Sequence, residues 1–126
     1  MRRVLYDVLL DGGGVGAHFL RGSTLLRRFH LVSRLYLSII RTFTYTAPTT
    51  VQLGTTASPG LLVPTFDPVT DYPPLPRADQ ITALPPTGNG EFIYTAADDF
   101  IVLTVDPGGG VLTDGAIEWW LDVEPA

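Results

Sequence analysis

The last third of the chain alternates hydrophobic and polar residues in the manner of half-buried β-strands. Residues 92–95 and 100–105 are rich in β-branched and aromatic side chains, and the short polar segment 97–99 between them suits a turn. The pattern therefore predicts an antiparallel hairpin over residues 92–105.

A second turn signal follows a glycine-rich segment at 106–110. Asp114-Gly115 has the composition of a type I′ turn and separates residues 111–113 from residues 116–123, so the C-terminal part is predicted to be a meander. In its last strand, alternate residues should face opposite sides of the sheet. One face would hold Ile117, Trp119, Leu121 and Val123, and the other Glu118, Trp120, Asp122 and Glu124. Which tryptophan is exposed depends on the register, because a slip of one residue would exchange Trp119 and Trp120.

The segment before residue 47 carries two overlapping patterns. From Leu25 to Phe43, apolar residues recur at spacings of four and three, which predicts a helix over 25–37 with Ser23 or Thr24 as its N-cap. From Ile39 onward, threonines alternate with aromatic residues, which predicts a strand. Arginines interrupt the apolar run between residues 25 and 43, so we expect no membrane span.

All eleven prolines follow residue 47, and eight of them lie between residues 59 and 86. That density leaves room for only short edge strands, at 61–63 and 80–84. The sequence thus predicts a mainly β fold, a small antiparallel β-sandwich or barrel. A basic N-terminal arm, residues 1–41, would be partly helical, and the β domain, residues 42–126, would contain a proline-rich extended loop at 59–87.

Charge sharpens this division. The net charge is −5, yet residues 1–41 hold seven arginines against two aspartates, and residues 42–126 hold one arginine against eleven acidic residues. Basic segments on acidic proteins commonly bind acidic surfaces or neighbouring copies. We therefore expect protein subunits of a larger assembly as partners, rather than nucleic acid. The candidate partner-binding residues are Arg21, Arg27, Arg28, Arg34, Arg41, Pro73, Pro74, Pro76 and Trp120.

No group of residues indicates catalysis, a metal or a cofactor. There is no cysteine, and the two histidines, His18 and His30, have neither metal-ligand spacing nor a neighbouring acid. Residues 12–17 formally fit a Gly-x-Gly-x-x-Ala phosphate-binding turn, but no acidic residue lies at 32–41, where a dinucleotide site needs one. The loop aspartates suit solvated turns better than calcium ligands. We predict a non-enzymatic protein.

The segment Arg41-Thr42-Phe43-Thr44-Tyr45-Thr46-Ala47-Pro48-Thr49-Thr50-Val51 and the strand-and-turn C-terminus resemble the small β-rich structural proteins of tailed-phage virions, such as head decoration or tail components. The resemblance covers residues 41–126 and carries over no functional residue. It implies a structural role in a virion, where the basic residues 1–40 depart from the usual pattern.

An alternative from another functional class remains open. Trp120 and Tyr94 could form an aromatic platform on which sugar rings stack, which would make the chain a carbohydrate-binding or adhesive β-sandwich module. The assembly hypothesis and this alternative differ in what the exposed aromatic residues contact: a protein subunit in one, a sugar in the other.

Overall fold

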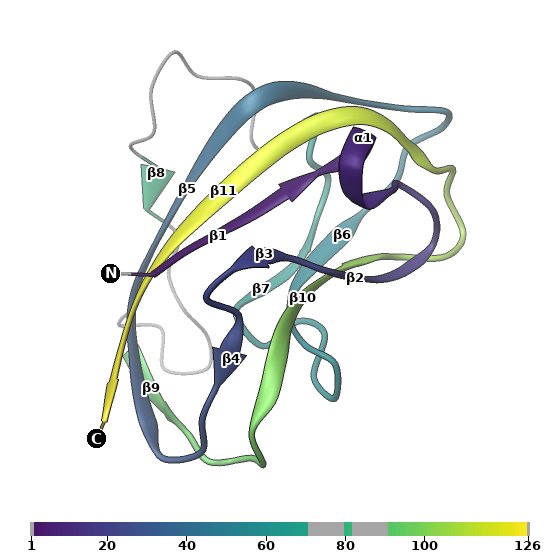
Figure 1. Cartoon of the computed structure of the whole chain (residues 1–126). Coiled ribbons are helices and arrows are strands. Elements are labelled where there is room, and N and C mark those ends of the chain that lie inside the picture. The colour runs from purple at the N-terminus through teal and green to yellow at the C-terminus, as the bar shows by residue number, and fades with distance from the viewer. Residues whose placement is uncertain (1, 71–79, 82–90, 126) are drawn as a thin grey trace.

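Two antiparallel sheets pack face to face in a sandwich-like arrangement (Figure 1). The computed structural model describes residues 2–70, 80–81 and 91–125. The first sheet contains, in spatial order, β3 (Arg21–Gly22), β1 (Arg2–Asp7), β11 (Leu112–Pro125), β5 (His30–Tyr45) and β8 (Gln80–Ile81), and β9 (Glu91–Tyr94) also pairs with β5. The second contains β2 (Gly16–Phe19), β10 (Asp99–Val105), β6 (Val51–Thr55) and β7 (Val63–Phe66), and β4 (Leu25–Leu26) pairs with β10. This arrangement confirms the prediction of a mainly β, sandwich-like fold.

The core lies between the sheets and draws alternate residues from their central strands. Its largest fully buried side chain is Trp119. Around it, the first sheet contributes Val4, Tyr6, Leu35, Leu37, Ile117 and Leu121, and the second contributes Leu53, Ile101 and Leu103. Each large side chain contributes roughly 1.5–3 kcal/mol by leaving water. The predicted alternation of the last strand is confirmed: Ile117, Trp119 and Leu121 are buried and Val123, on the same face, is half-buried.

The predicted helix over residues 25–37 is wrong. Leu25 and Leu26 form β4, and from His30 the chain runs as one 16-residue strand, β5. Leu35, Leu37 and Ile39 alternate on the core side, opposite Leu121, Trp119 and Ile117 of β11. The helical spacing and this period-two pattern coexist in the same residues. The strand forms because residues 30–45 pair with β11, about 80 residues later in the chain. A helix here would leave β11 without this partner strand, and that loss outweighs the local helical preference.

The strands of the predicted hairpin are found, but they do not pair with each other. β9 and β10 occupy almost the predicted residues, yet β9 pairs with β5 and β10 pairs with β2, β4 and β6. Residues 95–98 therefore connect one sheet to the other, as Figure 1 shows at the lower end of the molecule. A short connection between two strands fits both a hairpin and a change of sheet.

Asp114-Gly115 does not form the predicted turn. β11 continues through these residues, and its register against β5 shifts between Leu112 and Ile117, as at a β-bulge. Gly115 has φ 131°, and an added Cβ would lie 2.4 Å from Cδ1 of Phe43. This glycine therefore permits a bend and a close packing contact inside one long strand, instead of a reversal.

Residues 1–41 contribute directly to both sheets. β1 pairs with β11 over its whole length, β2 pairs with β10, and the proposed boundary at residue 41 falls inside β5. Helix in this region is limited to α1 (Val8–Asp11), a four-residue turn that the Asp7 side chain caps. Val4, Tyr6 and Val8 belong to the core, so this basic segment is also structural.

Within the proline-rich segment, β7 begins where a strand at 61–63 was predicted to end, and β8 covers the first two residues of the strand predicted at 80–84. The remainder of that strand lies outside the described residues. Pro73, Pro74 and Pro76 lie there too, so their predicted role in partner binding stays a prediction.

Candidate partner-binding face

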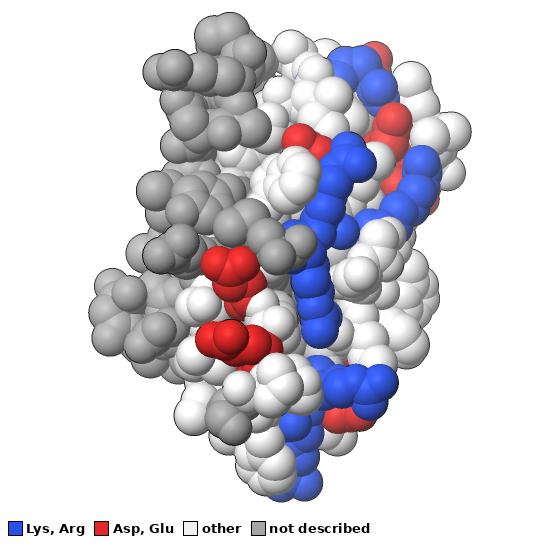
Figure 2. All heavy atoms as spheres, turned by 60° about the vertical axis from the view of Figure 1, so that its left-hand side comes forward, with Lys and Arg blue, Asp and Glu red and all other residues white. Residues whose placement is uncertain are grey.

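Arginines from three neighbouring segments gather on one side of the sandwich, around β3. Figure 2 shows basic side chains running in a column down this side, with acidic side chains beside part of it. Two adjoining open hollows lie here, of about 430 and 420 Å³. The arginines that line them, which we call the basic face, are Arg2, Arg3, Arg21 and Arg27.

β1 places its two arginines on opposite sides of the first sheet. Because Val4 and Tyr6 face the core, strand alternation puts Arg2 on the core side, at the rim of the sandwich, and Arg3 on the outer side. The guanidinium of Arg2 donates a hydrogen bond to the carbonyl oxygen of Leu25. Burial, and then the nearby charge of Arg27, lowers the pKa of Arg2. Two cations therefore share the rim.

On the outer side, Arg3 contacts β11. Its Nε donates to Oε2 of Glu118 at 2.5 Å, and its guanidinium carbon lies 5.7 Å from the centroid of the Trp120 ring. Trp120 is half-buried and pairs directly with Arg3 across the strands. Trp120 was predicted to lie among acidic residues, but its ring also lies beside the guanidinium of Arg3. The positive charge of Arg3 is attracted to the face of this ring.

Arg21 lies on β3, where the short strand pairs with Leu5 of β1. Its guanidinium donates to Oδ1 of Asp11 at 2.9 Å, so α1 and β3 are joined by an ion pair. Its side chain remains 42% exposed, which leaves donors available to a partner. Such exposed ion pairs contribute little to stability, about 0–1 kcal/mol.

The turn between β4 and β5 presents Arg27, Arg28 and Phe29 to solvent. Phe29 has φ 63°, a left-handed conformation that bulky residues rarely adopt, and its amide donates to the carbonyl oxygen of Tyr94 at 2.6 Å. Its ring is 58% exposed and Arg28 lies over it. Asp98 accepts from the amide of Arg28 and lies 3.8 Å from the Arg27 guanidinium.

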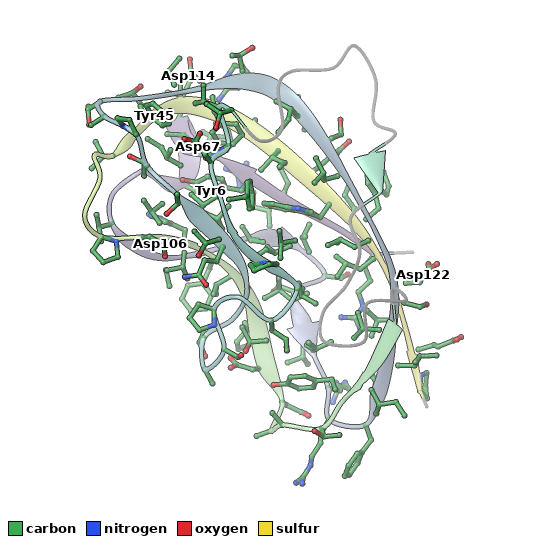
Figure 3. The ribbon with its side chains drawn as sticks, turned by 180° about the vertical axis from the view of Figure 1, so that it is seen from behind. Tyr6, Tyr45, Asp67, Asp106, Asp114 and Asp122 are labelled. Carbon is green, nitrogen blue, oxygen red and sulfur yellow. The ribbon has the colours of Figure 1, made fainter. Side chains whose placement is uncertain are left out.

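Arg41 has a different environment at the other end of the sandwich. Its guanidinium donates to Oδ1 of Asp7 and to Oδ1 of Asp114, both at 2.6 Å. These hydrogen bonds lower the pKa of both carboxyl groups and raise the pKa of Arg41. Figure 3 shows Asp114 at this end, near Tyr45, whose hydroxyl donates to Asp67. Arg41 links β5 to β1 and β11, and it lines neither hollow of the basic face.

The sequence-predicted residues thus separate into groups. Arg21 and Arg27 belong to the basic face, Arg28 extends it at the turn, and Trp120 lies beside Arg3. The side chain of Arg34 lies outside the described residues. Sequence reasoning missed Arg2 and Arg3. Their alternation with buried Val4 and Tyr6 is the signal that marks β1 as a strand, and it would have placed one arginine at the rim.

The aromatic platform proposed for sugar is not present as predicted. Tyr94 is 4% exposed, and its hydroxyl donates to the carbonyl oxygen of Ala97 at 2.6 Å. Its ring therefore offers no face to solvent, and Trp120 has no exposed aromatic partner in Tyr94.

No phosphate-binding turn forms at the glycine-rich segment. α1 precedes the glycines, and β2 follows them, so the strand–turn–helix order of such a site is missing. His18 is held there by the carbonyl oxygens of Asp11 and Gly14, at 3.1 and 2.7 Å. Among the described residues, no cluster of three histidine or acidic side chains could hold a metal ion.

Comparison with family models, with curated proteins and with solved structures found no match to this chain. In the part of the chain that the structure describes, no helix has the length and hydrophobicity needed to cross a bilayer.

Proposed function

We propose that this protein is a non-enzymatic structural module that docks on neighbouring protein subunits through its basic face. The observation that carries this proposal is the gathering of Arg2, Arg3, Arg21 and Arg27 around two open hollows, in a chain whose net charge is −5. A local positive surface on an acidic protein is attracted to the acidic surface of another subunit, including a second copy.

Exposed apolar side chains support the same role. Phe29 at the β4–β5 turn is 58% exposed, and Ile93 on the neighbouring β9 is 51% exposed. Aromatic residues and arginine are enriched in protein interfaces, and the most important contacts are often made by just such side chains. The strained backbone of Phe29 also suits a residue selected for contact rather than for stability.

The assembly we propose is a virion, with the protein as a capsid decoration or tail component. This rests on the resemblance of residues 41–126 to small β-rich virion proteins. Purified particles assembled without the protein should bind it, and both should sediment together. Particles that sediment without it would refute binding to the shell.

Docking between copies is tested by light scattering of the purified protein over a range of concentration and salt. Removing residues 1–40 is unsuitable here, because β1 to β4 and part of the core would be lost. The double variant Arg21→Gln, Arg27→Gln keeps the fold intact, since both side chains are exposed. We expect the wild type to form an oligomer that dissociates with salt, and the variant to be monomeric.

The control is Thr42→Glu, Ala47→Glu, which changes the net charge equally at exposed residues outside both hollows. It should associate like the wild type if the basic face makes the contact. Equal loss of association in both variants would mean that net charge, and not this face, drives assembly. A wild type that is monomeric at every concentration would contradict docking between copies.

A further inference from the structure

One of the two hollows of the basic face, the one that Arg2 and Arg27 line together, has the composition of an anion-binding site. It lies between the start of β1, the segment that joins β3 to β4, and β10. Its lining residues are Arg2, Gly22, Ser23, Thr24, Leu25, Arg27 and Phe100. At about 430 Å³ it is within the range of small-molecule sites.

The two arginines in this hollow have little negative charge near them. Among the described residues, Arg2 has no carboxylate within ion-pair distance, and its one hydrogen bond goes to the carbonyl oxygen of Leu25. The nearest carboxylate oxygen of Asp98 lies 3.8 Å from Arg27, between two side chains that are at least half exposed. The charge of Arg27 is close enough to Arg2 to lower its pKa, after burial. An anion between them would relieve this repulsion.

Two hydroxyl groups, on a tight backbone turn, also line this hollow. The side chains of Ser23 and Thr24 make no hydrogen bond within the described residues, so both hydroxyls are available as donors. Gly22 has φ 104°, and a Cβ there would lie 2.2 Å from the carbonyl oxygen of Arg3. Only glycine permits this close approach, which brings residues 22–24 against β1 beside the arginines.

We propose that this hollow binds an oxyanion of the phosphate or sulfate type, held by Arg2 and Arg27 and by the hydroxyls of Ser23 and Thr24. Two guanidinium groups match a doubly charged anion, and tetrahedral oxygens accept from several directions at once. A carboxylate carries one charge and two oxygens, and so fits less well. This assignment does not depend on subunit docking, because it concerns a small ligand.

The hollow is larger than a phosphate ion, and one wall is apolar. Phe100 is 48% exposed there, and Leu25 is half-buried. The anion can therefore be a free ion or a group attached to a ring or another apolar body. The shared chemistry is the tetrahedral oxyanion, and the two sources differ in whether Phe100 is contacted.

The test is a titration of the full chain, followed by the backbone amide signals in two-dimensional NMR. The probes are inorganic phosphate, phenyl phosphate and acetate, each compared with sodium chloride at equal ionic strength. We expect saturable shifts at residues 22–24 with inorganic phosphate. Arg27→Gln should weaken this binding about tenfold, the usual effect of losing a charge-assisted hydrogen bond. Tighter binding of phenyl phosphate would assign an attached oxyanion, and equal binding a free one.

Arg28→Gln is the matched control, because it removes one charge from the next residue, which does not line the hollow. It should bind phosphate like the wild type. Equal weakening in both variants, or shifts no larger than those with chloride, would overturn the site. Acetate binding as tight as phosphate would overturn the tetrahedral class. Docking of subunits could survive all these results, since light scattering measures it separately.

Discussion

Arg41 and Arg27 show how the same side chain serves two different ends of this molecule. Arg41 is held at 2.6 Å by both Asp7 and Asp114, and it links three strands of the first sheet. Arg27 lies 3.8 Å from one exposed carboxylate, in a hollow that it shares with another arginine. The first arginine is already neutralised within the fold, and the second has charge left for a partner.

The contrast between Arg41 and Arg27 distinguishes an arginine whose charge stabilises the fold from one whose charge is available for binding. Close hydrogen bonds to two carboxylates lower the pKa of those groups and hold Arg41 in one conformation. Two arginines that share a hollow repel each other, so the folded state gains nothing from their proximity. Side chains that do not stabilise the fold yet converge on one surface are better explained by a partner.

The largest expected effect comes from the backbone beneath the Arg41 site. Gly115 accepts a hydrogen bond from Arg41 through its carbonyl oxygen at 3.3 Å, and a Cβ there would lie 2.4 Å from Phe43. Gly115→Ala should therefore destabilise the protein by about 3 kcal/mol, through overpacking and an unfavourable positive φ. Urea unfolding measures this.

The control for that change is Gly14→Ala, because a Cβ at Gly14 would meet no atom within 4 Å. It should alter the free energy of unfolding by less than about 0.5 kcal/mol. Similar losses in both variants would mean that glycine flexibility, and not the contact with Phe43, explains the effect.

Arg41→Gln should lower stability at neutral pH, because Asp7 and Asp114 would face each other without the guanidinium that now binds both. The hydrogen bonds from Arg41 keep the pKa of both carboxyl groups below the ordinary aspartate value of 3.8 in the folded state. Their contribution is therefore complete above that value and disappears as pH falls through the lower, folded pKa.

Urea unfolding of the wild type and Arg41→Gln at pH 7 and at about pH 2.5 checks this linkage. The wild type should be more stable at pH 7, and the difference should shrink as the pH falls and protonation of Asp7 and Asp114 removes their ion pairs with Arg41. A difference that does not change with pH would show that Arg41 stabilises the fold by packing alone.

Phe29→Asn should raise stability by about 1 kcal/mol, because asparagine adopts a left-handed backbone more easily than phenylalanine does. Phe29 has φ 63° and a mostly exposed ring, so little burial is lost. The thermal midpoint should rise while association of copies weakens. A fall in the thermal midpoint would indicate that contact with Arg28 outweighs the strain.

The smallest expected effect is that of Arg27→Gln on stability. Its ion pair with Asp98 is long and exposed, and Arg2 is relieved of a neighbouring charge. The free energy of unfolding should stay within about 0.5 kcal/mol of the wild-type value. A clear loss of stability would show that Arg27, like Arg41, stabilises the fold, and would contradict the contrast drawn between these two arginines.

Much of the strand content is readable from short-range alternation. The segments that become β9 and β10, the second half of β5, and the buried face of β11 with Trp119 all follow the pattern of residues along the chain. Which strands pair with each other is not readable in the same way. The connection at residues 95–98 has the length of a hairpin loop, but it crosses between sheets, because β5 is available to β9 and β6 is available to β10.

The basic face, too, could be predicted only in part from the sequence. The excess of arginine before residue 41 is visible in the sequence, and Arg21 and Arg27 were expected to bind a partner. Arg2 and Arg3 were not, since their place depends on β1 pairing with β11 more than a hundred residues away. Arg41 belongs to the same run of sequence, yet the fold pairs it with two carboxylates outside both hollows.

The sequence by itself determined the β class, the positions of many strands and the separation of basic from acidic residues, because alternation and composition act over a few neighbouring residues. Only the tertiary structure decided that residues 30–37 are strand and not helix, which strands pair, and which arginines are neutralised. Those outcomes depend on contacts between distant segments, in which the burial of β5 against β11 outweighs a local preference worth tenths of a kcal/mol per residue.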